Sequence, residues 1–72
     1  MKLPKWFDGE VYEDGEIITN PLTGENVTLT NEEVSMYDLI KGAEMLQQYD
    51  IMEKGLAWFK EANPEAYLIL LD

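Results

Sequence analysis

The side chains in this sequence that could do chemistry are almost all carboxylates. There are 15 aspartates and glutamates against 5 lysines, and histidine, cysteine and arginine are absent. Serine–histidine pairs, thiolate nucleophiles, imidazole zinc sites and arginine clamps therefore have no residues to build them. Carboxylates alone catalyse when two of them share a cleft, and 72 residues are few for a cleft. We expect a protein that is not an enzyme and uses no cofactor.

The densest group of charges lies near the N-terminus, in residues 8–16. Oxygen ligands of this kind suit calcium, but the spacing of an EF-hand loop is not met. If Gly15 is the glycine at loop position 6, position 3 is Tyr12 and the final position is Pro21. We therefore predict a solvated acidic surface without a metal, formed by Asp8, Glu10, Glu13, Asp14 and Glu16.

The net charge of −10 at pH 7 restricts the class of partner. Five lysines neutralise few phosphates, so binding to a nucleic-acid backbone is excluded. An acidic surface is attracted to a basic patch on another protein. Trp6 and Phe7 precede any regular element, so they either fold back onto the core or are offered to the partner. The candidate partner-binding residues are Trp6, Phe7, Asp8, Glu10, Glu13, Asp14 and Glu16.

Turn signals dominate residues 1–30. Asp14-Gly15 suits a type I′ turn between residues 10–13 and 16–19, which predicts a β-hairpin. Asn20 to Gly24 supplies a second turn, and residues 27–29 follow as a short third strand. The pattern predicts a hairpin or a three-stranded meander, which must pack on helices to be stable.

A helix is expected to begin at Asn31. Thr30 and Glu33 have the spacing of a capping box, and Leu29 and Val34 stand at the positions of a hydrophobic staple. The helix is expected to run to about residue 48, with one apolar face as core: Met36, Leu39, Ile40, Ala43 and Leu46. Three apolar residues off that face either extend the core under the meander or form a homo-oligomer seam: Val34, Met45 and Tyr49.

A second helix is expected after a break near Tyr49-Asp50. Without the break, the apolar stripe of residues 51–62 faces more than about 100° away from the first. Asp50 and Glu53 suggest a second capping box, and Gly55 allows the facing helix to approach. Asn63 is expected to cap a short last helix. Residues 67–71 are alternatively a strand that joins the meander.

These elements predict an α+β fold in one domain, residues 1–72. Turns and short strands form the part up to residue 30: a short N-terminal β-hairpin or three-stranded meander. A helical hairpin and a short C-terminal helix follow. So small a chain buries only about 60% of its unfolded surface, and a homo-oligomer is the remaining source of stability. No apolar stretch is long enough for a membrane span, and residues 1–8 lack the features of a signal peptide, so we expect a cytoplasmic protein.

Several segments carry a resemblance to known proteins. They are residues 20–25 (NPLTGE), 27–30 (VTLT), 36–42 (MYDLIKG), 54–59 (KGLAWF) and 68–72 (LILLD). Together they resemble small acidic proteins of marine tailed bacteriophages, cyanophages among them. That group has no assigned activity, so the resemblance implies a phage origin and the host cell cytoplasm, and no role for individual residues.

Two interpretations of function stay open. The first is a non-enzymatic interaction protein, a phage accessory or host-modulating factor, from which a minor virion component cannot be separated. The alternative is an inhibitor that mimics nucleic acid, with rows of carboxylates in place of phosphates. Because five of the 15 acids crowd into residues 8–16 and the rest are scattered, the sequence favours the first interpretation.

Overall fold

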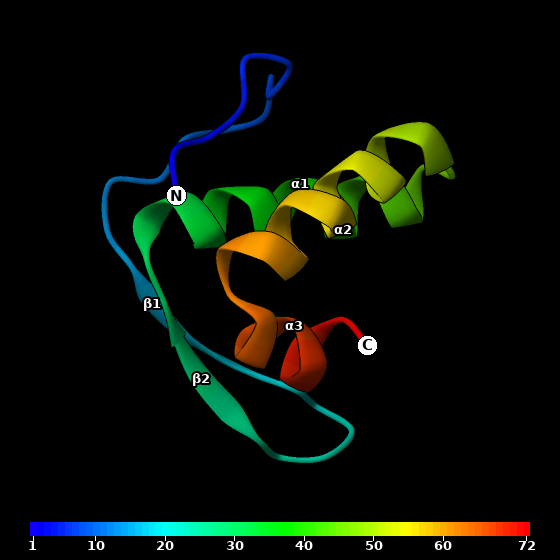
Figure 1. Ribbon diagram of the computed structural model, residues 1–72. Coiled ribbons are helices and arrows are strands. Elements are labelled where there is room, and N and C mark those ends of the chain that lie inside the picture. Colours follow the sequence, from blue (N-terminus) through cyan, green and yellow to red (C-terminus); the bar gives the residue numbers. More distant parts are fainter.

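Two short strands precede three helices in the computed structural model, which describes residues 1–72. The elements are β1 (Glu16–Thr19), β2 (Asn26–Leu29), α1 (Asn31–Met45), α2 (Tyr49–Ala62) and α3 (Pro64–Leu70). Helices α1 and α2 lie side by side as a helical hairpin, and β2 and α3 pack near one end of it (Figure 1). The expected α+β fold, a β-hairpin followed by a helical hairpin and a short last helix, is confirmed.

Strands β1 and β2 form an antiparallel hairpin across the second of the two expected turns. Asn20 N donates to Glu25 O at 2.7 Å, and Gly24 N donates to Asn20 O at 2.8 Å. Gly24 has a φ of 79°, a left-handed conformation that favours glycine. Asn20 Nδ2 also donates to Ile69 O at 2.8 Å, which ties this turn to α3.

The strand expected before Asp14-Gly15 does not form, so the hairpin across this pair and the three-stranded meander are both wrong. The backbone of Tyr12 bonds to α1 instead. Its N–H donates to Ser35 Oγ at 2.9 Å, and its carbonyl accepts from Asn31 Nδ2 at 3.3 Å. Gly15 has no positive φ; it lies so close to Leu29 O that a Cβ would clash. Contacts with the helix start thus replace the expected strand pairing.

Residues 1–15 form an irregular segment, the strap, which loops along one side of the helical hairpin (Figure 1). Lys2 O accepts from Trp58 Nε1 of α2 at 3.0 Å. Further along, Gly9 lies against Leu39 of α1, since a Cβ at Gly9 would be 3.3 Å from Leu39 Cδ1. The strap is therefore held to both helices, and three of its side chains pack against the core: Leu3, Phe7 and Tyr12.

The capping box at the start of α1 is confirmed. Glu33 N donates to Thr30 Oγ1 at 3.2 Å, and Thr30 N donates to Glu33 Oε1 at 3.1 Å. Glu33 Oε1 also accepts from Asn63 Nδ2 at 3.1 Å, which joins the start of α1 to the end of α2. Asn63 Oδ1 accepts from Ala66 N, and Pro64 follows this cap as expected. The last apolar run is therefore helical, and the alternative of a strand is wrong.

The core lies between the three helices and β2. Gly55 brings α1 and α2 close together, as the sequence predicted, because a Cβ there would lie 2.6 Å from Ile40 Cγ1. The rings of Trp58 and Phe59 pack edge to face with centroids 6.3 Å apart. None of the helices has the length and apolarity needed to cross a membrane. The buried cluster consists of Leu29, Val34, Met36, Ile40, Trp58, Phe59, Ala66 and Leu70.

Helix α1 ends earlier than the sequence indicated, at Met45 instead of near residue 48. Gln47 takes a left-handed φ of 58° and donates from N to Glu44 O at 3.2 Å. Gln48 N donates to Ala43 O at 2.8 Å. These two bonds form a Schellman motif, which ends helices and usually has glycine at the left-handed position.

The early end of α1 changes the predicted core and the predicted second cap. Leu46 falls in the turn and is 70% exposed, so its assignment to the core is wrong. The capping box expected from Asp50 and Glu53 does not form, because the N-cap of α2 is Gln48. Gln48 makes no side-chain capping bond, so the turn between α1 and α2 is held by backbone bonds alone.

Candidate interaction surfaces

The five acids of the predicted cluster are exposed, and two of them, Glu10 and Glu16, act on the same phenol as Asp38 of α1. No group of three or more acidic side chains is arranged to hold a metal ion. The negative charge of Asp38 is the main cause that raises the pKa of the Tyr12 phenol, and desolvation, Glu10 and Glu16 add to the rise. Carboxylates of the strap and of α1 therefore share one face around Tyr12. We call the five acids of the predicted cluster the acidic strap: Asp8, Glu10, Glu13 and Asp14 of the strap, with Glu16 at the start of β1.

The sequence left open whether Trp6 and Phe7 fold back onto the core or are offered to a partner, and the two residues differ in this respect. Phe7 folds back and packs against the core. Trp6 stays exposed, and Lys54 Nζ of α2 lies 5.9 Å from the centroid of its ring. Trp6 is thus the one of the pair that is accessible next to the acidic strap.

Few of the acids are paired with a cation inside the protein. Of the 15 acids, only Glu32 and Glu44 have such a partner, the Met1 amino group at 3.9 Å and Lys41 Nζ at 4.0 Å. Three of the five lysines lie over aromatic rings: Lys41 over Tyr37, Lys54 over Trp6 and Lys60 over Tyr67. The net charge of −10 is therefore displayed on the surface with little internal compensation.

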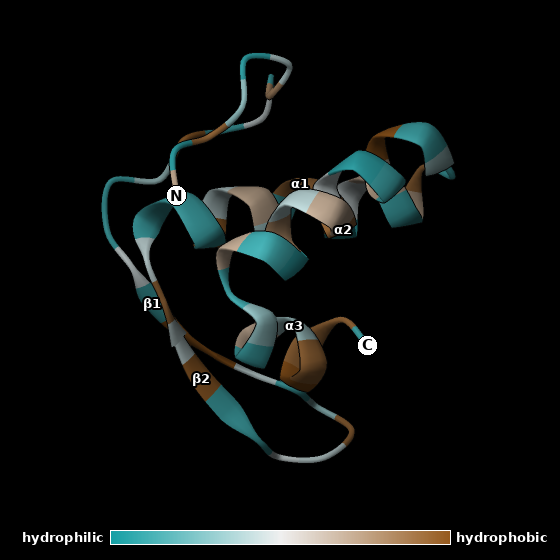
Figure 2. Cartoon of the chain, in the orientation of Figure 1, coloured by the Kyte–Doolittle hydropathy of each residue, from teal (hydrophilic) through white to brown (hydrophobic).

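The turn between α1 and α2 exposes three apolar side chains, which we call the apolar tip: Met45, Leu46 and Tyr49. They are 83%, 70% and 57% exposed. Figure 2 shows apolar residues among the hydrophilic ones at this far end of the helical hairpin. Val34, the third predicted seam residue, is instead buried in the core of the single chain, so it extends the core and is not available to a seam.

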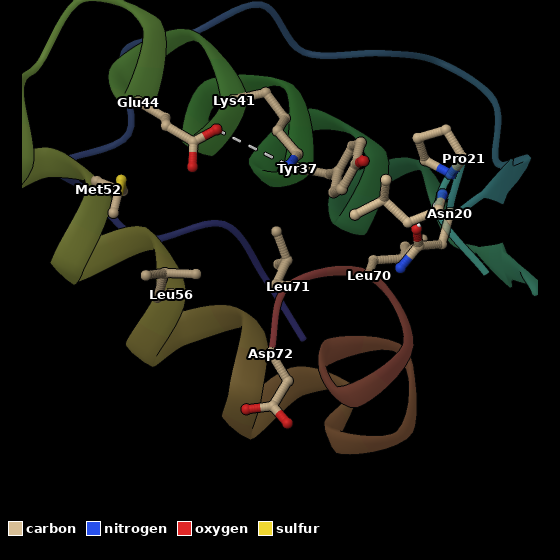
Figure 3. A pocket seen from close by; sticks show the side chains of 11 residues that line it. Asn20, Pro21, Tyr37, Lys41, Glu44, Met52, Leu56, Leu70, Leu71 and Asp72 are labelled. Atoms are coloured by element: carbon tan, nitrogen blue, oxygen red, sulfur yellow. Dashed lines mark hydrogen bonds and ion pairs between the residues drawn. The ribbon is translucent and has the colours of Figure 1, made fainter.

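A groove of about 310 Å³ lies between the helical hairpin, the β1–β2 turn and the end of the chain (Figure 3). Met52 and Leu56 line it from α2, and Tyr37, Lys41 and Glu44 line it from α1. We call it the open groove. The turn and the last residues supply the remaining lining: Asn20, Pro21, Leu22, Leu70, Leu71 and Asp72.

The strap and the open groove lie on opposite sides of α1. Leu39 lies against Gly9 of the strap, Ile40 is buried in the core, and Lys41 lines the groove. Successive side chains of a helix point about 100° apart. The buried residue therefore separates the residue that meets the strap from the one that meets the groove.

Helix α2 repeats this arrangement. Lys54 lies over the ring of Trp6 in the strap, Gly55 is buried, and Leu56 lines the groove. The helical hairpin therefore has a strapped face, which the chain itself covers, and an open face, which borders the groove.

The open groove combines an apolar wall with charged groups. Lys41 is the one cation among its lining residues, and its Nζ lies 4.0 Å from Glu44 and 5.7 Å from the centroid of Tyr37. Two carboxylates, Glu44 and Asp72, line the same groove. This set of residues is suited to holding an apolar side chain among charged groups, as binding sites do.

Sequence reasoning named none of the groove residues as functional. A signal was present, because Tyr49, Met52 and Leu56 recur at i, i+3 and i+7 and so share one face of α2. That spacing is also typical of a core stripe, and the structure alone shows that it leads from the apolar tip into the groove.

No family model, curated protein or solved structure matches this chain. The phage origin implied by the resemblance therefore stays a prediction.

Proposed function

We propose that the protein is a non-enzymatic interaction protein that binds a basic patch on another protein. The observation that carries the proposal is the uncompensated surface charge: 15 acids, of which two have an intramolecular cation. With the phage origin that the resemblance implies, the partner is a host protein and the chain is an accessory or host-modulating factor.

The acidic strap is the part of this surface that meets the partner. Its five carboxylates are exposed and have no cation within ion-pair distance, so a partner's lysines and arginines meet no internal competitor. Asp38 adds its charge beside Glu10 and Glu16, and these carboxylates raise the pKa of the Tyr12 phenol. A field of one sign speeds encounter with an oppositely charged surface and weakens as salt rises.

Binding of a fluorescent oligolysine, measured by anisotropy at low and physiological salt, tests this function. Two variants with equal net charge are compared. The strap variant carries Glu10→Gln, Glu13→Gln and Asp14→Asn. The control variant changes exposed acids elsewhere, Glu25→Gln, Glu53→Gln and Glu61→Gln.

We expect the strap variant to bind about tenfold more weakly than the wild type and the control variant to bind about threefold more weakly. The loss of affinity in the strap variant reflects both lost local contacts and the change in net charge. The loss in the control variant reflects only the change in net charge. Equal losses in the two variants, or no binding by the wild type, would contradict the proposal.

Self-association of the same protein stays a prediction, with the apolar tip as its seam. Light scattering should give a mass above 8.3 kDa that rises with salt, because each copy carries a charge of −10. Leu46→Ser in the tip should lower that mass, whereas Leu68→Ser, also exposed but on α3, should not. A mass near 8.3 kDa at every salt concentration would refute self-association.

A further inference from the structure

We propose that the open groove is a second binding site, separate from the acidic strap, which takes a lysine- or arginine-rich segment with apolar anchor side chains from a partner protein. The inference rests on the proposed function only in taking the partner to be basic. It adds a different face, a different contact and a chemical description of the segment that binds.

The strapped face shows what fills such a surface on this helical hairpin. There the chain crosses the two helices with three apolar side chains directed at the core, Leu3, Phe7 and Tyr12. A hydrogen bond from Trp58 Nε1 to Lys2 O holds the segment in place. On the open face, the β1–β2 turn and the last residues border the neighbouring helix positions without filling the space between them, and a groove of about 310 Å³ is retained.

Apolar side chains surround this groove and continue beyond it. Leu22 lines it from the β1–β2 turn and is 93% exposed, the highest value of any large apolar residue in the protein. On α2, Met52 and Leu56 form the apolar wall, and Tyr49 of the apolar tip extends the same helix face. The unbranched side chain of Met52 adapts to partners of varied shape. The surface is therefore suited to anchor side chains from a segment of another protein.

Charge selects the occupant. Glu44 and Asp72 line the groove, and its one lysine, Lys41, already lies 4.0 Å from Glu44. Around it the whole molecule carries a charge of −10. An acidic segment, or a second copy of this chain, would bring like charge to this face, whereas a basic segment is attracted to it.

The probe is a fluorescent peptide of leucine and lysine patterned as an amphipathic helix, titrated with the full chain at physiological salt. Two control peptides have the same length: one has serine in place of every leucine, and one has glutamate in place of every lysine. We expect the leucine–lysine peptide to bind at least about tenfold more tightly than either control.

The groove is tested with two matched leucine variants. Leu22→Ser removes an apolar side chain from the groove, and Leu68→Ser removes one that is 64% exposed on α3 and lies outside it. Both side chains are exposed, so the fold should survive both changes, which circular dichroism verifies. We expect Leu22→Ser to weaken binding of the leucine–lysine peptide by about fivefold and Leu68→Ser to leave it unchanged.

A pair of lysine variants tests the sign of the charge effect. Lys41→Gln removes the cation that lines the groove from α1. Lys60→Gln removes a cation of α2 that lies outside the groove. Both make the net charge more negative by one. Lys41→Gln should tighten binding of the basic peptide about threefold, and Lys60→Gln should have a smaller effect.

The outcomes separate this inference from the proposed function. Equal effects of the two leucine variants, or equal effects of the two lysine variants, would overturn the groove as the site. Equal binding of the serine control peptide would overturn the apolar anchors. Tighter binding of the glutamate control, or a self-associated mass that Leu22→Ser lowers in light scattering, would overturn the basic occupant. Loss of oligolysine binding in the strap variant with an intact groove response would uphold both sites. Unchanged oligolysine binding in the strap variant with an intact groove response would leave only the groove.

Discussion

The strapped face of the helical hairpin is completed by the protein's own chain, whereas the open face keeps a groove at the corresponding positions. Polar bonds fix the strap: Ser35 Oγ accepts from Tyr12 N and donates to Asn31 O at 2.7 Å. On the open face, the comparable tether is the bond from Asn20 Nδ2 to Ile69 O, which holds the β1–β2 turn in place and leaves the groove accessible.

This difference between the two faces separates stability from recognition. The strapped face buries apolar side chains and satisfies the polar groups around them, which stabilises the fold. The open face leaves apolar side chains next to solvent, and such patches are typical of interaction sites. Changes to the first should therefore alter the free energy of unfolding, and changes to the second should mainly alter binding.

The largest expected loss of stability comes from a substitution that disrupts the packing of the helical hairpin, on which both faces depend. Gly55→Val places a side chain where even a Cβ would lie 2.6 Å from Ile40 Cγ1. We expect a loss of about 2–3 kcal/mol in the free energy of unfolding, measured by urea denaturation. Gly42→Ala is the control, because a Cβ there meets no atom within 4 Å and alanine favours a helix. A midpoint for Gly55→Val at or above the wild-type value would contradict the close packing of α1 and α2.

The second-largest expected effect comes from a substitution that weakens the strapped face and leaves the open face intact. Ser35→Ala removes the acceptor of the Tyr12 N–H at a position that is almost fully buried. We expect a loss of about 1–2 kcal/mol in the free energy of unfolding, because a partly buried donor loses its partner. Binding of the leucine–lysine peptide at the open face should persist in folded Ser35→Ala. Unchanged stability would show that the strap does not depend on this bond.

A substitution at the turn that joins the two helices should raise the free energy of unfolding instead of lowering it. Gln47 has a φ of 58°, which a side chain with a Cβ adopts at a cost and glycine adopts freely. Gln47→Gly should therefore raise the free energy of unfolding by about 0.5–1 kcal/mol in thermal or urea melts. A destabilised variant would mean that the Schellman motif is not what ends α1.

The smallest effect concerns the phenol at the edge of the strapped face. Asp38, desolvation, Glu10 and Glu16 raise the pKa of Tyr12 above its value in the unfolded chain. The stabilisation linked to this shift is therefore complete below the unfolded pKa of about 10 and is lost as pH rises through the folded value. Tyr12→Phe should lose less stability than the wild type above that pH.

The protein has four tyrosines, so the difference between the absorbance titrations of the wild type and Tyr12→Phe isolates the Tyr12 phenol. Asp38→Asn removes the main cause of the shift, so it should bring the pKa of Tyr12 back toward its ordinary value. An unchanged titration curve in Asp38→Asn would show that this acid does not face Tyr12.

Local sequence signals were sufficient to predict the parts of the fold where a residue type has a strong structural preference, such as a helix cap or a close helix contact. Thr30 and Glu33 predict the start of α1, Gly55 predicts the close helix contact, and Asn63 predicts the last cap, and the structure confirms each. In these places the hydrogen bond or contact lies within a few residues or depends on a missing side chain.

Other features depend on contacts that no local pattern encodes. Asp14-Gly15 resembles a hairpin turn, but Gly15 is needed for its approach to Leu29, which lies far along the chain. The end of α1 was misplaced because a glutamine, Gln47, occupies the left-handed position where glycine is the usual signal. The groove requires four segments to meet, α1, α2, the β1–β2 turn and the last residues, so its lining could not be predicted from spacing.

Amide chemical shifts of the isotopically labelled protein, recorded during titration with the leucine–lysine peptide, test the assignment of the two faces most directly. Leu39 and Lys54 report on the strapped face, and Leu22, Lys41 and Leu56 report on the open face. We predict that the largest shifts occur at Leu22, Lys41 and Leu56, with small shifts at Leu39 and Lys54. Largest shifts along the strap or at Leu39, with the groove residues unchanged, would contradict the assignment of the open face to binding.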